Sequence, residues 1–264
     1  MTTQDTLRVL TDGPIATLLL NRPAQRNAIS YDMWRRLPDV IATLEADEQV
    51  RAVVITGAGN RAFSAGADIT EFEATRSTPQ KALDYRNRVE TACKALASLS
   101  KPSIAAINGY CLGGGLELSL YADLRVAASN AVFSLPAAHR GIAIGHSHVA
   151  RMVGMIGIAN AAHMLLTGQR IGADEARQCG LITSVVASQS ALTASVRLAN
   201  EIAALSPISH QAHKQILNDL LDYGLEAQIP KSRLKLIDQA EASADFLEGV
   251  RSFMEGRPPV FKGR

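Results

Sequence analysis

Three consecutive glycines followed closely by a glutamate form the stretch of this sequence best suited to chemistry. The glycines at 113–115 separate an apolar, strand-like run at 102–107 from a helix-like run that begins at Leu116 and contains Glu117. Glycine is unfavourable in a regular element by roughly 0.5–1 kcal/mol, so three in a row indicate unusual dihedral angles or a close approach of backbone. Amides at the start of a helix can hold an anion or a developing oxyanion. Close helix packing without chemistry is the alternative at this stage.

A second run of small residues lies earlier in the chain. Residues 63–69 read Phe-Ser-Ala-Gly-Ala-Asp-Ile and follow an apolar, β-branched run at 51–56. Because the side chains are small, this backbone can lie directly against a ligand. An ordinary turn of small residues explains the run as well.

Hydrophobic periodicity predicts the elements that would position these two runs. Alternating residues at 7–11 and 15–20 flank a turn and predict a β-hairpin. Ser30 precedes apolar residues at helical spacing and predicts a capped helix, and another helix is expected at about 80–99. Further strands are expected at 51–56, 102–107, 121–127 and 131–134, with mostly helices after 156. The alternation predicts an α/β fold built in layers.

The composition is that of an ordinary globular chain. Its 264 residues suffice for one large domain, hydrophobic residues make up 47% and charged residues 20%. The net charge of +2 gives no general attraction to nucleic acid or to a membrane surface, although it leaves room for a local basic site.

Cysteine usage and the N-terminus predict a cytoplasmic location. Cys93, Cys111 and Cys179 are odd in number and widely spaced, which argues against a disulfide framework or a zinc site and predicts buried thiols. The first five residues lack a basic start with an apolar run behind it, and no uninterrupted apolar segment is long enough to cross a membrane. We expect no membrane partner.

Four motifs, in order along nearly the whole chain, resemble the enoyl-CoA hydratase/isomerase (crotonase) family. They are Leu20-Asn21-Arg22-Pro23 with Asn27-Ala28, the run at 63–68, Ala106-Ile107-Asn108-Gly109 with 113–117, and Pro259-Val260-Phe261-Lys262-Gly263-Arg264 at the end. Each motif alone is weak, whereas their conjunction at these spacings is specific.

The resemblance implies a fold and a ligand class. It implies an α/β spiral of repeated β-β-α turns over residues 1–200 and a helical region at 201–264 used in trimerisation, commonly within a hexamer of two trimers. The ligand it implies is a coenzyme A thioester. Coenzyme A then enters as part of the substrate, and no separate cofactor, metal or nucleic acid is expected.

The resemblance also implies roles for particular residues. The two backbone amides of the family's oxyanion hole match Ala67 and Gly114, where only small side chains are needed. Two preorganised N–H donors would stabilise a thioester enolate, and loss of one such donor costs about 2.7–4 kcal/mol in other enzymes. Positions that match the path of coenzyme A and its pantetheine arm are Ala24, Arg26, Ala65, Gly66, Asp68 and Ile69, with Phe261 and Lys262 at its adenosine end. Arg26 would contact a phosphate, whereas the tail residues would contact a neighbouring subunit's ligand or only pack the terminus.

Glu117 matches one of the two glutamates of the hydratases. In a buried site its pKa would be raised, and it could exchange a proton with the acyl chain; pairing with the helix dipole is the alternative. The second glutamate would fall at Ala137, which transfers no proton, and another carboxylate position used by relatives falls at Gly145. Residues that could substitute are His139, His146, His148, Glu71 and Glu73.

We therefore expect an acyl-CoA-processing enzyme of fatty acid metabolism that stabilises a thioester enolate, with Glu117 as its main proton carrier. Enoyl-CoA hydratase is the first functional hypothesis. Double-bond isomerisation, decarboxylation and C–C cleavage remain alternatives because of Ala137. A non-catalytic coenzyme A-binding relative is a further one.

Overall fold

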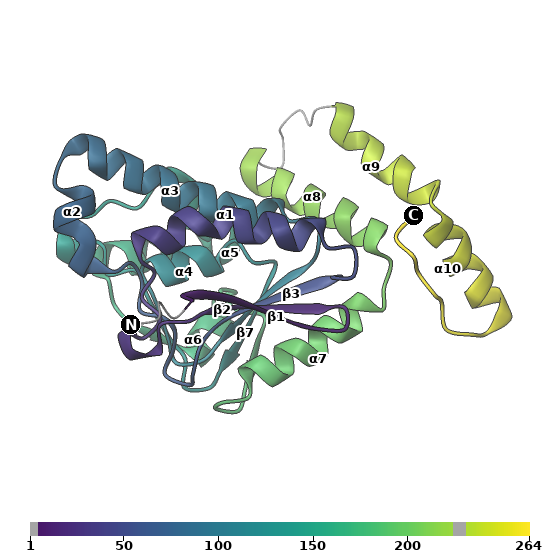
Figure 1. The fold of residues 1–264 in the computed structure, drawn as a ribbon, viewed down its shortest axis with the longest axis horizontal. Coiled ribbons are helices and arrows are strands. Elements are labelled where there is room, and N and C mark those ends of the chain that lie inside the picture. Colours follow the sequence, from purple (N-terminus) through teal and green to yellow (C-terminus); the bar gives the residue numbers. More distant parts are fainter. Residues whose placement is uncertain (1–4, 224–230) are drawn as a thin grey trace.

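The strands of the chain are shared between two sheets (Figure 1). The computed structural model describes residues 5–223 and 231–264. Within them, a six-stranded sheet has the order β1 (Leu7–Asp12), β2 (Ile15–Leu20), β3 (Ala52–Gly57), β5 (Ser103–Ile107), β7 (Leu124–Ala128) and β10 (Ser184–Val186). A smaller sheet has the order β4 (Ala62–Ser64), β6 (Tyr110–Leu112), β8 (Val132–Ser134) and β9 (Ile171–Gly172).

From β3 to β8, successive strands alternate between the two sheets, and each pair is followed by a helix. The first turn is β3 and β4 followed by η2 (Ile69–Glu71), α2 (Phe72–Arg76) and α3 (Pro79–Ser98). The second is β5 and β6 with α4 (Gly114–Ser119), and the third is β7 and β8 with η3 (Ala138–Arg140) and α5 (His146–Thr167). The strands β3, β5 and β7 pair in parallel, and so do β4, β6 and β8. The predicted β-β-α spiral is confirmed.

The elements at the N-terminal end also match those predicted from the sequence. The hairpin of β1 and β2 is antiparallel with Leu7 opposite Leu20, and β2 then pairs in parallel with β3. After η1 (Pro23–Gln25), the helix α1 (Tyr31–Ala46) begins behind Ser30, whose hydroxyl accepts a hydrogen bond from the Met33 amide. This cap satisfies one of the amides left without an intrahelical partner.

The large sheet has helices on both faces. Because side chains alternate along a strand, Val53 and Ile55 contribute to the main core, whereas Val54 belongs to a second cluster on the other face. The second cluster includes Ala199 and Ala203 of α7 (Ala191–Ala203), which lies below the sheet as drawn, opposite α1 and α3 (Figure 1). The short helix α6 (Ala173–Gln178) follows β9.

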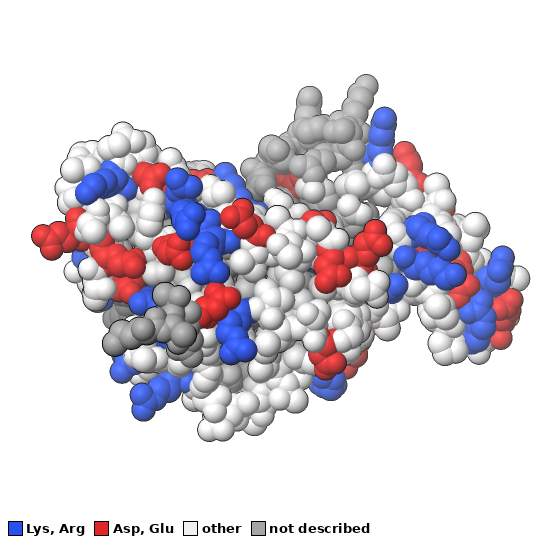
Figure 2. Space-filling view, viewed as in Figure 1, with Lys and Arg blue, Asp and Glu red and all other residues white. Residues whose placement is uncertain are grey.

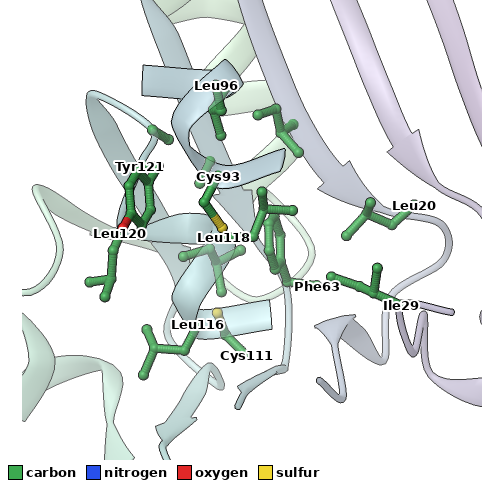
Figure 3. Packing of buried hydrophobic residues seen from close by; sticks show 14 of the residues in the cluster. Leu20, Ile29, Phe63, Cys93, Leu96, Cys111, Leu116, Leu118, Leu120 and Tyr121 are labelled. Atoms are coloured by element: carbon green, nitrogen blue, oxygen red, sulfur yellow. The ribbon is translucent and has the colours of Figure 1, made fainter. Parts of the chain in front are cut away.

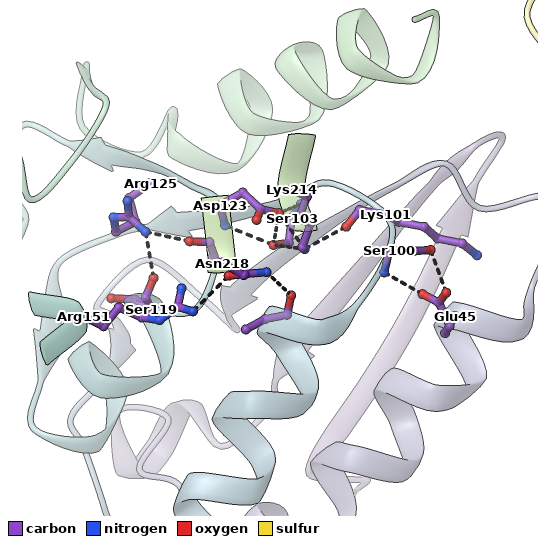
Figure 4. Close-up of polar contacts among 12 residues, drawn as sticks. Glu45, Ser100, Lys101, Ser103, Ser119, Asp123, Arg125, Arg151, Lys214 and Asn218 are labelled. Carbon is purple, nitrogen blue, oxygen red and sulfur yellow. Dashed lines mark hydrogen bonds and ion pairs between the residues drawn. The ribbon is translucent and has the colours of Figure 1, made fainter. Parts of the chain in front are cut away.

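Polar contacts tie α8 (Pro207–Tyr223) to the body of the protein (Figure 4). The buried Lys214 ammonium lies 2.7 Å from the Asp123 carboxylate and donates to the Lys101 carbonyl. The Asn218 side chain donates to the Ala97 carbonyl of α3. Arg125 is also buried and donates to three backbone carbonyls, those of Ser119, Ala122 and Leu181.

The C-terminal helices lie to one side of this body. Helix α9 (Lys231–Glu241) and helix α10 (Ala244–Glu255) extend away from the sheet, and the tail folds back along α10 (Figure 1). The predicted boundary at residue 200 falls inside α7, which packs on the sheet. Residues 1–4, part of the N-terminal stretch predicted to lack a leader pattern, and 224–230, inside the predicted helical region, lie outside the described residues.

Helix α5 is the one described helix long and apolar enough to cross a membrane by length and composition. It nevertheless buries Met152, Ile156 and Met164 in the core, and Gly157 interrupts it with a non-helical backbone. Core helices of soluble proteins pass the same test.

Both charge signs are mixed on the surface drawn in Figure 2. Basic and acidic side chains lie side by side over α1 to α3 and again over α10. Two of the predicted buried thiols, Cys93 and Cys111, are buried, whereas Cys179 is half-exposed; all three are free.

Candidate active site

Each of the three glycines has a different structural role. Gly113 has a φ of +48°, a conformation that residues with a side chain rarely adopt. A Cβ on Gly115 would lie 2.6 Å from the Cβ of Ser64, so β4 and α4 could not approach as they do. Gly114 is the first residue of α4, two residues earlier than the sequence pattern predicted.

Three leucines pack α4 and the residue after it into the core, and Glu117 lies on the opposite side of the helix. Leu116, Leu118 and Leu120 are buried beside Phe63 and other apolar side chains (Figure 3). Glu117 instead lines a cavity of about 900 Å³, and its side chain is 13% exposed. The apolar residues on either side of Glu117 therefore fix the direction of its carboxyl group.

The amides of Ala67 and Gly114 lie next to one another. A Cβ built on Gly114 would lie 3.3 Å from the Ala67 nitrogen, and one on Gly66 would lie 3.4 Å from the Gly114 nitrogen. In the bridge between Ile29 and Ala67, the amides used are those of Ile29 and Asp68. Neither the Ala67 nor the Gly114 amide donates to a backbone acceptor among the described loop contacts. Both residues line the cavity, so a ligand oxygen there can accept from the two amides.

Burial sets the protonation of Glu117. Loss of solvent raises its pKa from an ordinary 4.5 to about 7, and the nearby positive charge of Arg76 opposes this shift. Near neutral pH the group is thus present in both forms, which suits a residue that both takes and gives a proton.

His148 is the titratable neighbour of Glu117. Its Nε2 lies 4.0 Å from a Glu117 carboxyl oxygen, its Nδ1 has no hydrogen-bond partner among the described residues, and its ring packs edge-on against Tyr121. Burial lowers the pKa of His148 to about 4, opposed by the Glu90 carboxylate, so the imidazole is neutral at pH 7.

The other predicted substitutes for a second acid lie farther out or are engaged. His139 is exposed and bonds the Thr167 carbonyl, and His146 is exposed at the start of α5. A Glu71 carboxyl oxygen accepts from the Tyr31 amide, and Glu73 is exposed. Ala137 and Gly145 line the cavity without a titratable side chain.

The predicted coenzyme A residues fall into two groups. Ala65, Gly66, Asp68 and Ile69 line the cavity. The Asp68 carboxylate, however, pairs with Arg22 at 2.8 Å and accepts from Thr70, so its charge is already compensated within the protein.

The remaining four lie outside the cavity lining. Ala24 belongs to η1, and Arg26, which follows it, holds its guanidinium over the ring of Tyr110 at 5.6 Å. The Phe261 carbonyl accepts from Arg51, and the Lys262 amide donates to Asp245, so the tail is packed against its own chain.

Trp34, Arg76 and Tyr85 are among the cavity residues that sequence reasoning missed. Trp34 and Tyr85 fit the apolar faces of α1 and α3, where aromatic residues are expected to be core. Arg76 ends α2, a helix too short to show a periodic signal.

Comparison with known proteins gives consistent results. The family model for enoyl-CoA hydratase/isomerase matches residues 11–264. The chain is 36% identical over 250 residues to 2,3-dehydroadipyl-CoA hydratase of Escherichia coli, covering 95% of this chain and 96% of the relative. It is 34% identical over 263 residues to carnitinyl-CoA dehydratase of Citrobacter koseri, covering 98% and 99%.

A solved structure described as an enoyl-CoA hydratase/carnithine racemase from Magnetospirillum magneticum superposes with a TM-score of 0.93. It is 32% identical and covers 99% of this chain and 97% of its own. Similarity therefore extends over the spiral, the cavity and the C-terminal helices together.

Proposed function

This chain belongs to the enoyl-CoA hydratase/isomerase family, and from that premise we propose that it adds water to the double bond of an enoyl-CoA thioester. Relatives named as hydratases and as a dehydratase, over nearly their full length, support the assignment. The observation that carries it is Glu117, half-protonated near neutral pH, in the same cavity as two adjacent free amides.

The amides of Ala67 and Gly114 act as the oxyanion hole. Attack at the β carbon moves electrons onto the thioester oxygen, where two fixed N–H donors meet the new negative charge. Donors in a site with little water stabilise the enolate more than the neutral thioester, because the charge develops only during the reaction.

Glu117 carries the proton in both steps. As a carboxylate it takes a proton from water, and the water oxygen forms the new C–O bond at the β carbon while the π electrons pass to the enolate. The protonated acid then returns that proton to the α carbon, where the enolate electron pair forms the C–H bond. One water has then been added across the double bond, and no resident cofactor is needed.

Double-bond isomerisation is the second candidate, favoured by Ala137. With no second carboxyl group at that place in the cavity wall, one acid can still move a proton between the α and γ carbons. The enolate and its amides would serve both reactions. The position of the bond in the product separates the two.

We further propose a homotrimer or hexamer in the cytoplasm. Helix α10 carries exposed apolar side chains, among them Leu247 at 62%, Phe253 at 88% and Met254 at 81%. Such a face is stabilised when another subunit covers it. An assembly of this kind would also bring the tail residues Phe261 and Lys262 near a neighbour's coenzyme A, and Arg26 would meet a phosphate of the same ligand.

The test is the hydration of crotonyl-CoA, followed by loss of the conjugated enoyl absorbance and by analysis of the product. Glu117→Gln is expected to lower kcat at least about 100-fold, the usual scale of general acid–base catalysis. Full activity in this variant would contradict the proposal, and a shifted double bond without hydration would select the isomerase.

A further inference from the structure

Arg76 is an uncompensated cation in the wall of the cavity. Its guanidinium carbon lies 4.8 Å from the Phe72 ring centroid and 5.1 Å from that of Tyr85. The structure gives it no ion pair or hydrogen bond to any described residue, and it is only partly exposed. Stacking on two rings holds the guanidinium in place while leaving its N–H donors free.

Two further polar groups beside it are buried. Tyr85 is 3% exposed and Trp34 is fully buried; the Trp34 indole N–H faces the Tyr85 oxygen as a donor, and the Tyr85 hydroxyl proton has no acceptor among the described residues. Both residues line the same cavity as Arg76. A buried hydroxyl without an acceptor is rare in folded proteins, so the Tyr85 hydroxyl indicates a ligand that accepts a hydrogen bond.

The carboxylates that face this group do not neutralise it. Glu71 and Glu117 act electrostatically on Tyr85, and the charge of Arg76 acts on Glu117, but neither carboxylate contacts Arg76 within ion-pair distance. Glu117 is reserved for the proton in the proposed reaction. The guanidinium therefore still has its full capacity for an anion from the substrate.

This cation is separate from Arg26, the arginine expected to meet coenzyme A. Arg26 and Arg170 both lie over the ring of Tyr110, at 5.6 and 5.9 Å, whereas Arg76 lies on α2 against Phe72 and Tyr85. Of the described cations, Arg76 is the one whose charge acts on Glu117. Its neighbourhood is thus the acyl part of the cavity, where the reacting carbons must lie.

We propose that the substrate's acyl chain carries a free carboxylate at the end away from the thioester, bound by Arg76 and by the Tyr85 hydroxyl. The substrate class is a monothioester of coenzyme A with a dicarboxylic acid, unsaturated beside the thioester. The inference rests on the proposed acyl-CoA function and adds to it the chemistry of the far end of the acyl chain. A guanidinium forms two parallel hydrogen bonds to a carboxylate, which gives both affinity and orientation.

Binding of unreactive, saturated thioesters tests this without any turnover. The dissociation constants of succinyl-, glutaryl- and adipyl-CoA would be measured by calorimetry against those of butyryl-, valeryl- and hexanoyl-CoA, which have the same chain lengths. The wild-type protein is expected to bind at least one carboxylated thioester about 10-fold or more tightly than its uncharged partner.

Two substitutions identify the residues responsible. Arg76→Met is expected to weaken binding of the carboxylated thioester about 10- to 100-fold and that of the uncharged one less than about 3-fold. Tyr85→Phe removes only a hydroxyl and is expected to cost about 2- to 10-fold, again for the carboxylated thioester alone. Arg88→Met is the matched control, because Arg88 lies on α3 beside Tyr85 but pairs with Asp84 at the surface.

The outcomes are distinct. Equal binding of charged and uncharged thioesters by the wild-type protein would overturn the proposal. Equal weakening of both by Arg76→Met would also overturn it, since Arg76 would then hold coenzyme A itself. A carboxylate preference that persists while neither enoyl thioester reacts would support this binding site and refute the proposed hydration.

Discussion

Replacing Glu117 with glutamine should make the protein more stable at alkaline pH while removing its activity. Burial keeps the Glu117 carboxyl group protonated up to about pH 7, whereas in the unfolded chain it ionises near its ordinary 4.5. Between these values the unfolded state has released a proton that the folded state still holds, so stability falls as pH rises. Glutamine has the shape of the protonated acid and cannot ionise, so the variant escapes this loss.

The size of the effect follows from the two pKa values. At 1.36 kcal/mol for each pKa unit, a rise from 4.5 to about 7 corresponds to about 3 kcal/mol when the group is fully ionised. The advantage of Glu117→Gln in the free energy of unfolding should therefore grow from about 1 kcal/mol at pH 5 to about 3 kcal/mol at pH 8.

The assay is urea unfolding of both proteins at these two pH values and at one protein concentration, because assembly also contributes to stability. Glu73→Gln, in which an exposed glutamate of α2 is replaced, controls for the loss of a negative charge. Equal stability of wild type and Glu117→Gln at pH 8 would refute the reasoning. Glu117 would then be ionised and satisfied in the folded protein.

Four shorter predictions follow from the same structure. Gly114→Ala places a methyl group 3.3 Å from the Ala67 amide and should lower kcat about 10²- to 10³-fold, whereas Gly172→Ala, with open space around it, should leave kcat unchanged. The kcat/KM for hydration should rise with pH through a pKa of about 7, because the first step needs the Glu117 carboxylate; a flat profile across pH 6–8 would contradict this. Asp123→Asn strands the buried Lys214 ammonium and should cost about 3 kcal/mol in urea unfolding, against less than about 0.5 kcal/mol for Glu201→Gln in the exposed pair with Arg197. Phe253→Glu should shift sedimentation toward a smaller species if α10 lies in a subunit interface, and an unchanged assembly would exclude α10 from that interface.

The spiral could be predicted because its signals are local. The alternation at 7–20, the Ser30 cap and the apolar run at 102–107 each specify one element from nearby residues. Short elements such as α2, β9 and β10 escaped prediction, since a few residues show no period and depend on the rest of the fold for their stability.

The sequence marks candidate site residues where the backbone must approach a ligand closely and, through the family resemblance, at Glu117. Glycines and small residues mark Ala67 and Gly114 in the sequence, because a close backbone approach restricts residue type. Arg76 and Tyr85 come near Glu117 only when the turns of the spiral are packed together, and the same packing places His148, a candidate from the sequence, 4.0 Å from its carboxyl group. No spacing of residues in the sequence predicts that these side chains lie near one another. Nor does the sequence show that the Asp68 carboxylate is already paired with Arg22.

Deuterium uptake at the α carbon of a saturated acyl-CoA thioester tests the enolate most directly. The wild-type protein, incubated with butyryl-CoA in D₂O and followed by NMR, should exchange the α protons through Glu117 while the Ala67 and Gly114 amides hold the oxygen. Glu117→Gln should show no exchange above the rate without protein. Exchange at the wild-type rate in this variant, or none in the wild-type protein itself, would contradict the proposed role of Glu117 and of the two amides.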